Sequence, residues 1–277
     1  MRIVILAPSV YSETACAMAA HLAESGYVPI AALAISALQP KTLLRKIGQW
    51  GIGASSRYAF AKLIPQHRAQ SVQNPYLEPM LRRGAAMFRS LSEVAAHYRF
   101  PLAVCNDMNS PGSVARLTQW SPDLIIFAGG NILRRSVLKV PRLGILNVHL
   151  GLLPEVRGMS TPEWSLLENV PAGITLHYMD AGIDTGPILK KYEFLHTKEC
   201  DSLRELRHRL VAFGVEKTVS VIASLDRREI SAEPQSSPDP DREKDKDRQF
   251  FVMHDWLRAR AAESFAQHRS TSGMAHG

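Results

Sequence analysis

Short apolar runs alternate along the chain with longer segments in which apolar residues recur at helical spacing. The first run, residues 1–7, predicts a buried strand, and Ser12 then precedes a helical pattern that extends to about Gly26. Further strands are predicted at 28–35, 101–105, 124–127, 145–148 and 173–179, and further helices at 161–169 and 202–225. Repeated strand-then-helix order is typical of a mostly parallel sheet flanked by helices, so the predicted fold class is α/β.

Three segments depart from this alternation. Residues 40–98 are predicted to be a mostly helical, basic insertion, longer than a simple crossover requires. Residues 235–248 are rich in Ser, Pro and charge and predict a flexible linker. Residues 250–257 are apolar enough to dock back onto the protein, and the last ten residues are predicted to be disordered. The predicted organisation is a main domain over 1–225, a linker over 226–249 and a short C-terminal segment over 250–277.

Two polar residues interrupt the apolar strand at 143–149. Asn147 and His149 are two positions apart, so their side chains leave the same side of a strand, where buried polar groups need partners or a purpose. The loop that follows carries turn residues, and loops after strands are where α/β folds place ligands. Beyond it, Thr161 is a candidate helix cap, with Pro162 suited to the first helical position. A carboxylate, Asp184, follows the strand at 173–179.

Several short motifs occur in an order and spacing that is more specific than any one of them. They are Asn147-x-His149, Leu153-Pro154, Arg157-Gly158, Gly173-Ile174-Thr175-Leu176-His177 and Asp184-x-Gly186. Together they resemble the folate-dependent formyltransferases, which act on glycinamide ribonucleotide, methionyl-tRNA or amino sugars. The resemblance covers residues 100–195 best and implies a Rossmann-like catalytic domain over 1–225. It also implies an enzyme that uses 10-formyltetrahydrofolate as co-substrate.

By position, the resemblance implies that Asn147, His149 and Asp184 are catalytic. Attack of an amine on a formyl carbon creates a negative oxygen, which amide and imidazole N–H groups can stabilise, while Asp184 can orient His149 or hold a proton-relaying water. Taken alone, such residues are more often hydrogen-bonded loop or core groups. His177 and Arg157 are substrate-binding candidates. His177 can equally be a supporting hydrogen-bonder, and Arg157 can bind a phosphate or carboxylate or simply be solvated.

Two segments are predicted to bind the folate, because a pterin needs an apolar slot beside backbone polar groups. The first follows the strand at 124–127 and resembles the family's pterin-side loop; its glycines would allow close backbone approach. The second lies beside Asp184. The predicted folate-binding residues are Gly129, Gly130, Asn131, Ile132, Leu133, Asp180, Ala181, Gly182 and Ile183. Without the resemblance, Ile132 and Leu133 would be interpreted as ordinary core.

Composition narrows the class of protein. A net charge of +7 and a pI near 9.4 favour anionic ligands, but no clustered basic and aromatic face supports nucleic-acid binding. The three cysteines lack metal-ligand spacing, so neither a zinc site nor a disulfide framework is expected. With no run long enough to span a membrane and no signal peptide, a cytoplasmic location is expected. The expected partners are folate and a small amine; the oligomeric state is left open, a homo-oligomer included.

Differences from family members narrow the choice of acceptor substrate. Residues 7–12, Ala-Pro-Ser-Val-Tyr-Ser, replace the glycine-rich phosphate loop of glycinamide ribonucleotide transformylases, and Leu150-Gly151 replaces the family's usual Pro-Ser after the histidine. A C-terminal barrel and an N-terminal regulatory domain are not expected. The remaining resemblance is to enzymes that formylate nucleotide-linked amino sugars, favoured here, or amino-acid amines. A 10-formyltetrahydrofolate hydrolase and a non-catalytic folate-binding protein are the alternatives.

Overall fold

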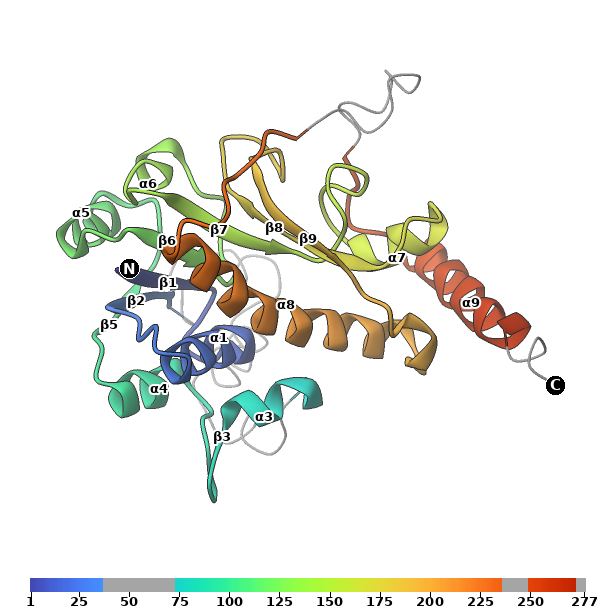
Figure 1. The fold of residues 1–277 in the computed structure, drawn as a ribbon, viewed down its shortest axis with the longest axis horizontal. Helices are drawn as coiled ribbons and strands as arrows, with labels where there is room; N and C mark the ends of the chain where they lie inside the picture. The colour runs from blue at the N-terminus through green and yellow to red at the C-terminus, as the bar shows by residue number, and fades with distance from the viewer. Residues whose placement is uncertain (37–72, 236–248, 273–277) are drawn as a thin grey trace, which may run out of the picture. The chain divides into compact units, whose positions relative to one another are not determined.

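The computed structural model describes residues 1–36, 73–235 and 249–272 (Figure 1). Within these ranges the chain forms two compact units, residues 1–143 and 144–277, and each is described by itself. Of the predicted insertion at 40–98, residues 40–72 lie outside the described part of the chain. The same holds for residues 236–248 of the predicted linker.

The first unit contains four parallel strands in the order β5-β2-β1-β6. β1 (Ile3–Ala7) lies between β2 (Ala31–Ile35) and β6 (Leu124–Phe127), and β2 also pairs with β5 (Leu102–Cys105). All five residues of β1 and of β2 are buried, as expected of parallel strands covered on both faces. These strands confirm the predicted α/β class, although β2 begins three residues later than predicted, after Pro29, which has no N–H to give to a sheet.

Helices of the first unit begin at the caps that the sequence supplies. α1 (Glu13–Glu24) begins after Ser12, whose side chain accepts from the Ala15 N–H, and α4 (Leu91–Tyr98) begins after Ser90 in the same way. The other helices among the described residues of this unit are η2 (Pro75–Leu77), α3 (Glu78–Leu81), α5 (Pro111–Trp120) and α6 (Arg135–Leu138). The mostly helical prediction for 40–98 is wrong at one place: β3 (Arg82–Arg83) and β4 (Ala86–Met87) form a small hairpin around Gly84, which has a positive φ.

The second unit contains three antiparallel strands in the order β7-β8-β9. β7 (Gly144–His149) and β8 (Gly173–Tyr178) were predicted within a residue at each end, whereas β9 (Ile188–Glu193) was not predicted. The predicted long helix is α8 (Leu203–Asp226), capped by Ser202, and it contacts β7 and β8. A side chain at Gly214 of α8 would clash with Val148 of β7, so this glycine allows the close approach.

α7 (Thr161–Leu167) follows the loop after β7 and corrects one prediction. Ser160, at a positive φ of 53°, occupies the cap position, and Thr161 is the first helical residue. Instead of capping the helix, the Thr161 hydroxyl donates to the carbonyl oxygen of Leu150 at 2.8 Å. The side chain therefore ties the start of α7 back to the end of β7.

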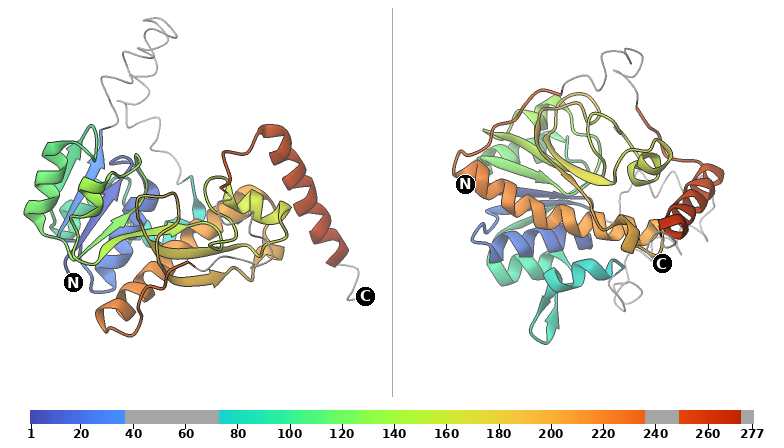
Figure 2. Two further views of the ribbon diagram at one scale, coloured as in Figure 1. Left: turned by 90° about the horizontal axis from the view of Figure 1, so that it is seen from above. Right: turned by 45° about the vertical axis from the view of Figure 1, so that its right-hand side comes forward.

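The C-terminal segment docks onto the second unit, as predicted. Phe250 and Met253 are buried, and Phe250 stacks on Trp164 of α7 with ring centroids 4.8 Å apart. α9 (Asp255–Ser272) then packs against α7 (Figure 2). The prediction of disorder over the last ten residues is wrong for 268–272, which are helical; 273–277 are outside the described residues.

Phe250→Ala is expected to lower the free energy of unfolding of the second unit by about 3–5 kcal/mol, because it removes a buried ring and leaves a cavity beside Trp164. Urea unfolding followed by tryptophan fluorescence measures the change. The neighbouring Phe251 is 73% exposed, so Phe251→Ala is the matched control and should change the free energy by less than about 0.5 kcal/mol. Equal losses in the two variants would show that the segment does not dock as described.

Candidate active site

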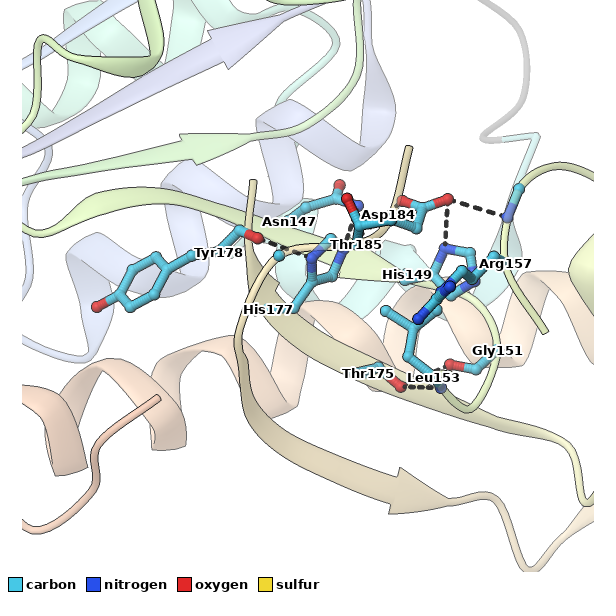
Figure 3. A network of polar contacts seen from close by, with 12 residues as sticks. Asn147, His149, Gly151, Leu153, Arg157, Thr175, His177, Tyr178, Asp184 and Thr185 are labelled. Carbon is cyan, nitrogen blue, oxygen red and sulfur yellow. Dashed lines mark hydrogen bonds and ion pairs between the residues drawn. The ribbon is translucent and has the colours of Figure 1, made fainter. Parts of the chain in front are cut away.

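Adjacent antiparallel strands bring the predicted polar residues together. In the register of β7 and β8, Asn147 lies opposite His177 and His149 lies opposite Thr175 (Figure 3). The Asn147 amide nitrogen lies 3.1 Å from Nε2 of His177, and the rings of His149 and His177 have centroids 6.2 Å apart. The alternation inferred for Asn147 and His149 therefore places both in one polar cluster with His177.

The hydrogen bonds of His177 determine which nitrogen carries its proton. Nδ1 lies 2.9 Å from the carbonyl oxygen of Tyr178, which can only accept, so Nδ1 is protonated. In the neutral ring Nε2 is then an acceptor, and it takes a hydrogen bond from the Asn147 amide. His177 is 1% exposed, and its hydrogen bond orients the Asn147 amide. This arrangement matches the supporting role considered for His177.

His149 is held in the opposite tautomer. Its Nε2 lies 2.7 Å from the carbonyl oxygen of Val156, so Nε2 carries a proton that is already donated. Nδ1 faces Oδ2 of Asp184 at 3.5 Å. Nδ1 of His149 is therefore the only ring nitrogen left to donate to a reacting oxygen. While the ring is neutral, Nδ1 carries no proton and can accept one instead.

Asp184 lies between the two imidazoles. Its Oδ2 accepts from the Gly158 N–H at 3.0 Å, and its Oδ1 lies 3.6 Å from Nε2 of His177. Asp184 adopts a positive φ of 54°, a conformation that costs free energy in a non-glycine residue unless neighbouring contacts hold it. Two residues later, Gly186 lies so close to the carbonyl oxygen of Tyr178 that any side chain there would clash with it.

The buried His149 and the partly buried Asp184 have shifted pKa values. Burial lowers the pKa of His149 below 6.5, and this outweighs the opposing effects of the Asp184 charge and of the Val156 carbonyl. Burial alone would raise the pKa of Asp184, but His177, His149 and the Gly158 N–H together bring it below its usual value. Near neutral pH the site thus holds a neutral His149 facing an ionised Asp184.

The loop between β7 and α7 is anchored by Thr175, which was not predicted as a site residue. Thr175, fully buried on β8, donates to the carbonyl oxygen of Gly151 at 2.7 Å and accepts from the Leu153 N–H at 3.0 Å. The Leu153–Pro154 peptide is cis. The loop then delivers the Val156 carbonyl to His149 and the Gly158 N–H to Asp184, so its backbone is part of the site.

Arg157 is half-buried beside this cluster, and a second unpredicted residue holds it. Nε and Nη2 of Arg157 both lie within hydrogen-bond distance of Oε1 of Gln235, at 3.2 and 2.8 Å. Nε2 of Gln235 donates to the carbonyl oxygens of Asp184 and Gly186, each at 2.8 Å. The linker prediction is therefore wrong at Gln235, the first residue of that segment, which is bonded to the site loop.

The first predicted folate-binding segment belongs to the first unit. Gly129 and Gly130 have positive φ values, and a side chain at Gly130 would require the end of the Met108 side chain to shift. Asn131 donates to Asp107 at 2.6 Å, while its own Oδ1 is buried and has no hydrogen-bond partner among the described residues. Leu133 is buried, consistent with a core role, whereas Ile132 is 80% exposed.

The second predicted folate-binding segment is the turn before Asp184, in the second unit. Asp180 Oδ1 accepts from the Gly182 N–H at 3.0 Å and from the Thr185 hydroxyl at 2.7 Å, which closes the turn. Ala181 and Gly182 are exposed, and Ile183 is 46% exposed. An exposed Ile183 side chain beside the polar cluster is available for an apolar ligand face.

Within the described ranges, no group of three or more His, Cys, Asp or Glu side chains could hold a metal ion. In the same ranges, each helix is too short or too polar to cross a membrane. Two residues of the site were not predicted as site residues: Thr175, which belongs to the motif at 173–177, and Gln235, which was predicted to be part of the linker. Both bond to groups that are distant along the chain, which local sequence does not reveal.

The stability of the protein is expected to decrease on acidification below about pH 6.5. His149 has a folded pKa below its unfolded value, so in that range the unfolded state binds a proton that the folded state does not. The free energy of unfolding should then fall by about 1.4 kcal/mol per pH unit until the folded ring also protonates. The lowered pKa of Asp184 acts in the same direction at more acidic pH, since its contribution is lost as pH falls through that pKa.

Urea unfolding between pH 7.5 and pH 5 measures this slope. His149→Gln should reduce it, because Gln does not titrate, while His196→Gln, at a largely exposed position, should leave it as in the wild type. A wild-type slope that persists in His149→Gln would contradict a neutral, buried His149.

Comparison with known proteins places this chain in a family. Residues 79–222, which are 144 of the 277, match the family model described as formyl transferase. Methionyl-tRNA formyltransferase of Syntrophomonas wolfei is 34% identical over 137 residues, 49% of this chain and 43% of that protein. The chain spans about half the length of the curated relatives it matches.

Solved structures share the fold at low sequence identity. Phosphoribosylglycinamide formyltransferase from Anaplasma phagocytophilum has a TM-score of 0.54 at 18% identity, covering 91% of this chain and 99% of that one. WlaRD, a sugar 3N-formyl transferase solved in the presence of dTDP and 5-N-formyl-THF, has a TM-score of 0.51 at 14% identity, covering 91% and 69%. With a matching family model over more than half of its residues, this chain belongs to the formyl transferase family.

Proposed function

We propose that this protein transfers a formyl group from 10-formyltetrahydrofolate to the primary amine of a small acceptor. The observation that carries the proposal is the partly buried cluster in which a neutral His149 faces an ionised Asp184 beside the Asn147 amide. Family membership supports the reaction class, and the matched sugar formyl transferase, solved with a formylated folate, supports the co-substrate.

In the proposed reaction the amine nitrogen attacks the formyl carbon and the carbonyl oxygen becomes negative. Asn147 uses one amide N–H on His177 and has a second with which to stabilise that oxygen. Nδ1 of His149 and Oδ2 of Asp184 are 3.5 Å apart, and both are acceptors when His149 is neutral, so an amine with N–H groups to donate can lie against both. The proton lost by the amine goes to His149, and the folate nitrogen gains one as its bond to the formyl carbon breaks.

The proposed acceptor is a nucleotide-linked amino sugar, with an amino-acid amine as the alternative. The solved structures that share the fold include a sugar 3N-formyl transferase and also a phosphoribosylglycinamide formyltransferase, so the fold is compatible with the sugar without selecting it. The turn after β1 argues against a binding site for a ribonucleotide phosphate at that position. In this turn the Tyr11 N–H already bonds to the Ser9 hydroxyl, and the Ser12 N–H bonds to the Ser9 carbonyl. These donors are not directed outward as a phosphate loop requires. Arg157 is the proposed contact for an acceptor phosphate or carboxylate.

Release of tetrahydrofolate from 10-formyltetrahydrofolate, followed by absorbance, tests the proposal. The reaction is run without amine and then with separate pools of nucleotide amino sugars, amino acids, ribonucleotide amines and methionyl-tRNA. Release that depends on the amino-sugar pool is the expected result. Release without amine would identify a hydrolase instead, and folate binding without release in any pool would favour a binding protein.

A further inference from the structure

We infer that Gln235 is a positioning residue for the reaction proposed above, holding the Asp184 loop and Arg157 in one fixed arrangement. The inference depends on the proposed function for its catalytic consequence but not for its geometry. Gln235 lies 51 residues beyond Asp184 and 78 residues beyond Arg157 in the sequence, and nothing in its local sequence marks it as part of a site.

The Gln235 amide has only one chemically permitted orientation. Its Nε2 faces two carbonyl oxygens, of Asp184 and Gly186, which can only accept, and its Oε1 faces the Arg157 guanidinium, which can only donate. Rotating the amide by 180° would place like groups against one another at all of these contacts. No other amino-acid side chain of this length provides two donors at one end and an acceptor at the other.

Gln235 is held in place by its own backbone neighbourhood. Two residues earlier, Glu233 exchanges both backbone hydrogen bonds with Ile188 at the start of β9, at 2.7 and 2.8 Å. Ile188 lies opposite His177 in the β8–β9 register. The segment is therefore tied to the same sheet that carries His177, two residues before Gln235 reaches the loop.

The hydrogen bonds of Gln235 affect both features that position the Asp184 carboxylate. One feature is the residue's own backbone, at a positive φ, which Gln235 holds through the Asp184 carbonyl. The other is the Gly158 N–H, which donates to Oδ2, and Gly158 directly follows Arg157. Because Gln235 holds both segments, losing its hydrogen bonds should let the carboxylate move relative to Nδ1 of His149, at present 3.5 Å away.

Three variants of the full-length protein test this inference. Gln235→Met keeps the length and lacks every hydrogen bond, Gln235→Ala removes the side chain, and Gln235→Glu keeps an acceptor for Arg157 but places a carboxylate against two carbonyl oxygens. Gln119→Met, at an exposed position of α5, is the matched control. Steady-state formyl transfer gives kcat and the KM for the folate. NMR titration of labelled histidine, with His149 assigned from His149→Gln, gives a readout that needs no turnover.

The expected result is a kcat reduced roughly 10- to 100-fold in all three variants, with the folate KM changed by less than about threefold. A His149 titration altered in Gln235→Met but not in Gln119→Met should accompany it. Wild-type kcat in Gln235→Met or in Gln235→Glu would overturn the inference. So would a lower kcat with a lower melting temperature and an unchanged His149 titration, which indicates a purely structural role. An altered titration in a protein that transfers no formyl group would support the positioning and refute the proposed function.

Discussion

His149→Gln is expected to reduce kcat/KM for formyl transfer by about 10²- to 10⁴-fold, the contribution of a positioned general acid–base. Gln can still donate to the Val156 carbonyl in place of Nε2, so the buried position keeps its hydrogen bond and the fold is retained. What it cannot do is accept and release a proton where Nδ1 faces Asp184. The amine would then have no neutral base adjacent to it during attack.

Rates measured with saturating folate and varied acceptor, together with folate binding by fluorescence titration, test this expectation. Folate affinity should be close to that of the wild type, since the loss is confined to the chemical step. His196→Gln is the control, because this side chain is largely exposed and lies outside the site. Near-wild-type turnover in His149→Gln would refute the assignment of His149 as the base, whatever the folate affinity.

Asp184→Asn is expected to reduce kcat by about 10²- to 10³-fold while leaving folate binding largely intact. The substitution preserves shape, and the Asn carbonyl oxygen can still accept from the Gly158 N–H. It removes the negative charge that faces both imidazoles and that stabilises a proton on His149. The protonated His149 formed during amine attack would therefore lose its counter-charge.

The pH dependence of Asp184→Asn separates this electrostatic role from a structural one. Asp184 raises the pKa of His149, so without it the pKa of the ring should fall further. If neutral His149 is the base, the acid limb of kcat/KM should move to lower pH in the variant as the maximal rate falls. Asp201→Asn, an exposed carboxylate in the same unit, should leave both the rate and the limb unchanged. A lower rate with an unmoved limb would contradict the pairing of Asp184 with His149.

Local sequence determined the helices and strands that depend only on neighbouring residues. Ser12, Ser90 and Ser202 each accept from a backbone N–H three residues later, so a cap and its helix lie within one turn of each other in the sequence. The apolar runs of β1 and β6 likewise indicate burial without reference to any distant residue. Local alternation also correctly predicted that Asn147 and His149 would leave β7 on one side.

Elements that depend on distant partners were missed or misplaced. β9, ILKKYE, has two exposed lysines and no apolar alternation of its own, and it is a strand because β8 and the Glu233 segment pair with it. The hairpin of β3 and β4 has only two residues in each strand, too few for a periodic signal. Thr is a residue type that often caps helices, but the hydroxyl of Thr161 donates to the carbonyl oxygen of Leu150, eleven residues away.

The sequence by itself determined which functional groups this protein brings to the reaction: an amide, an imidazole and a carboxylate at the ends of predicted strands and in the loops that follow. Only the tertiary structure decided their chemical states. Val156 and Tyr178 fix opposite tautomers in His149 and His177, and burial makes His149 the neutral member of its pair. The tertiary structure also recruits Gln235. Hydrogen-bond direction and desolvation depend on which atoms meet in space, and no local pattern of residues specifies that.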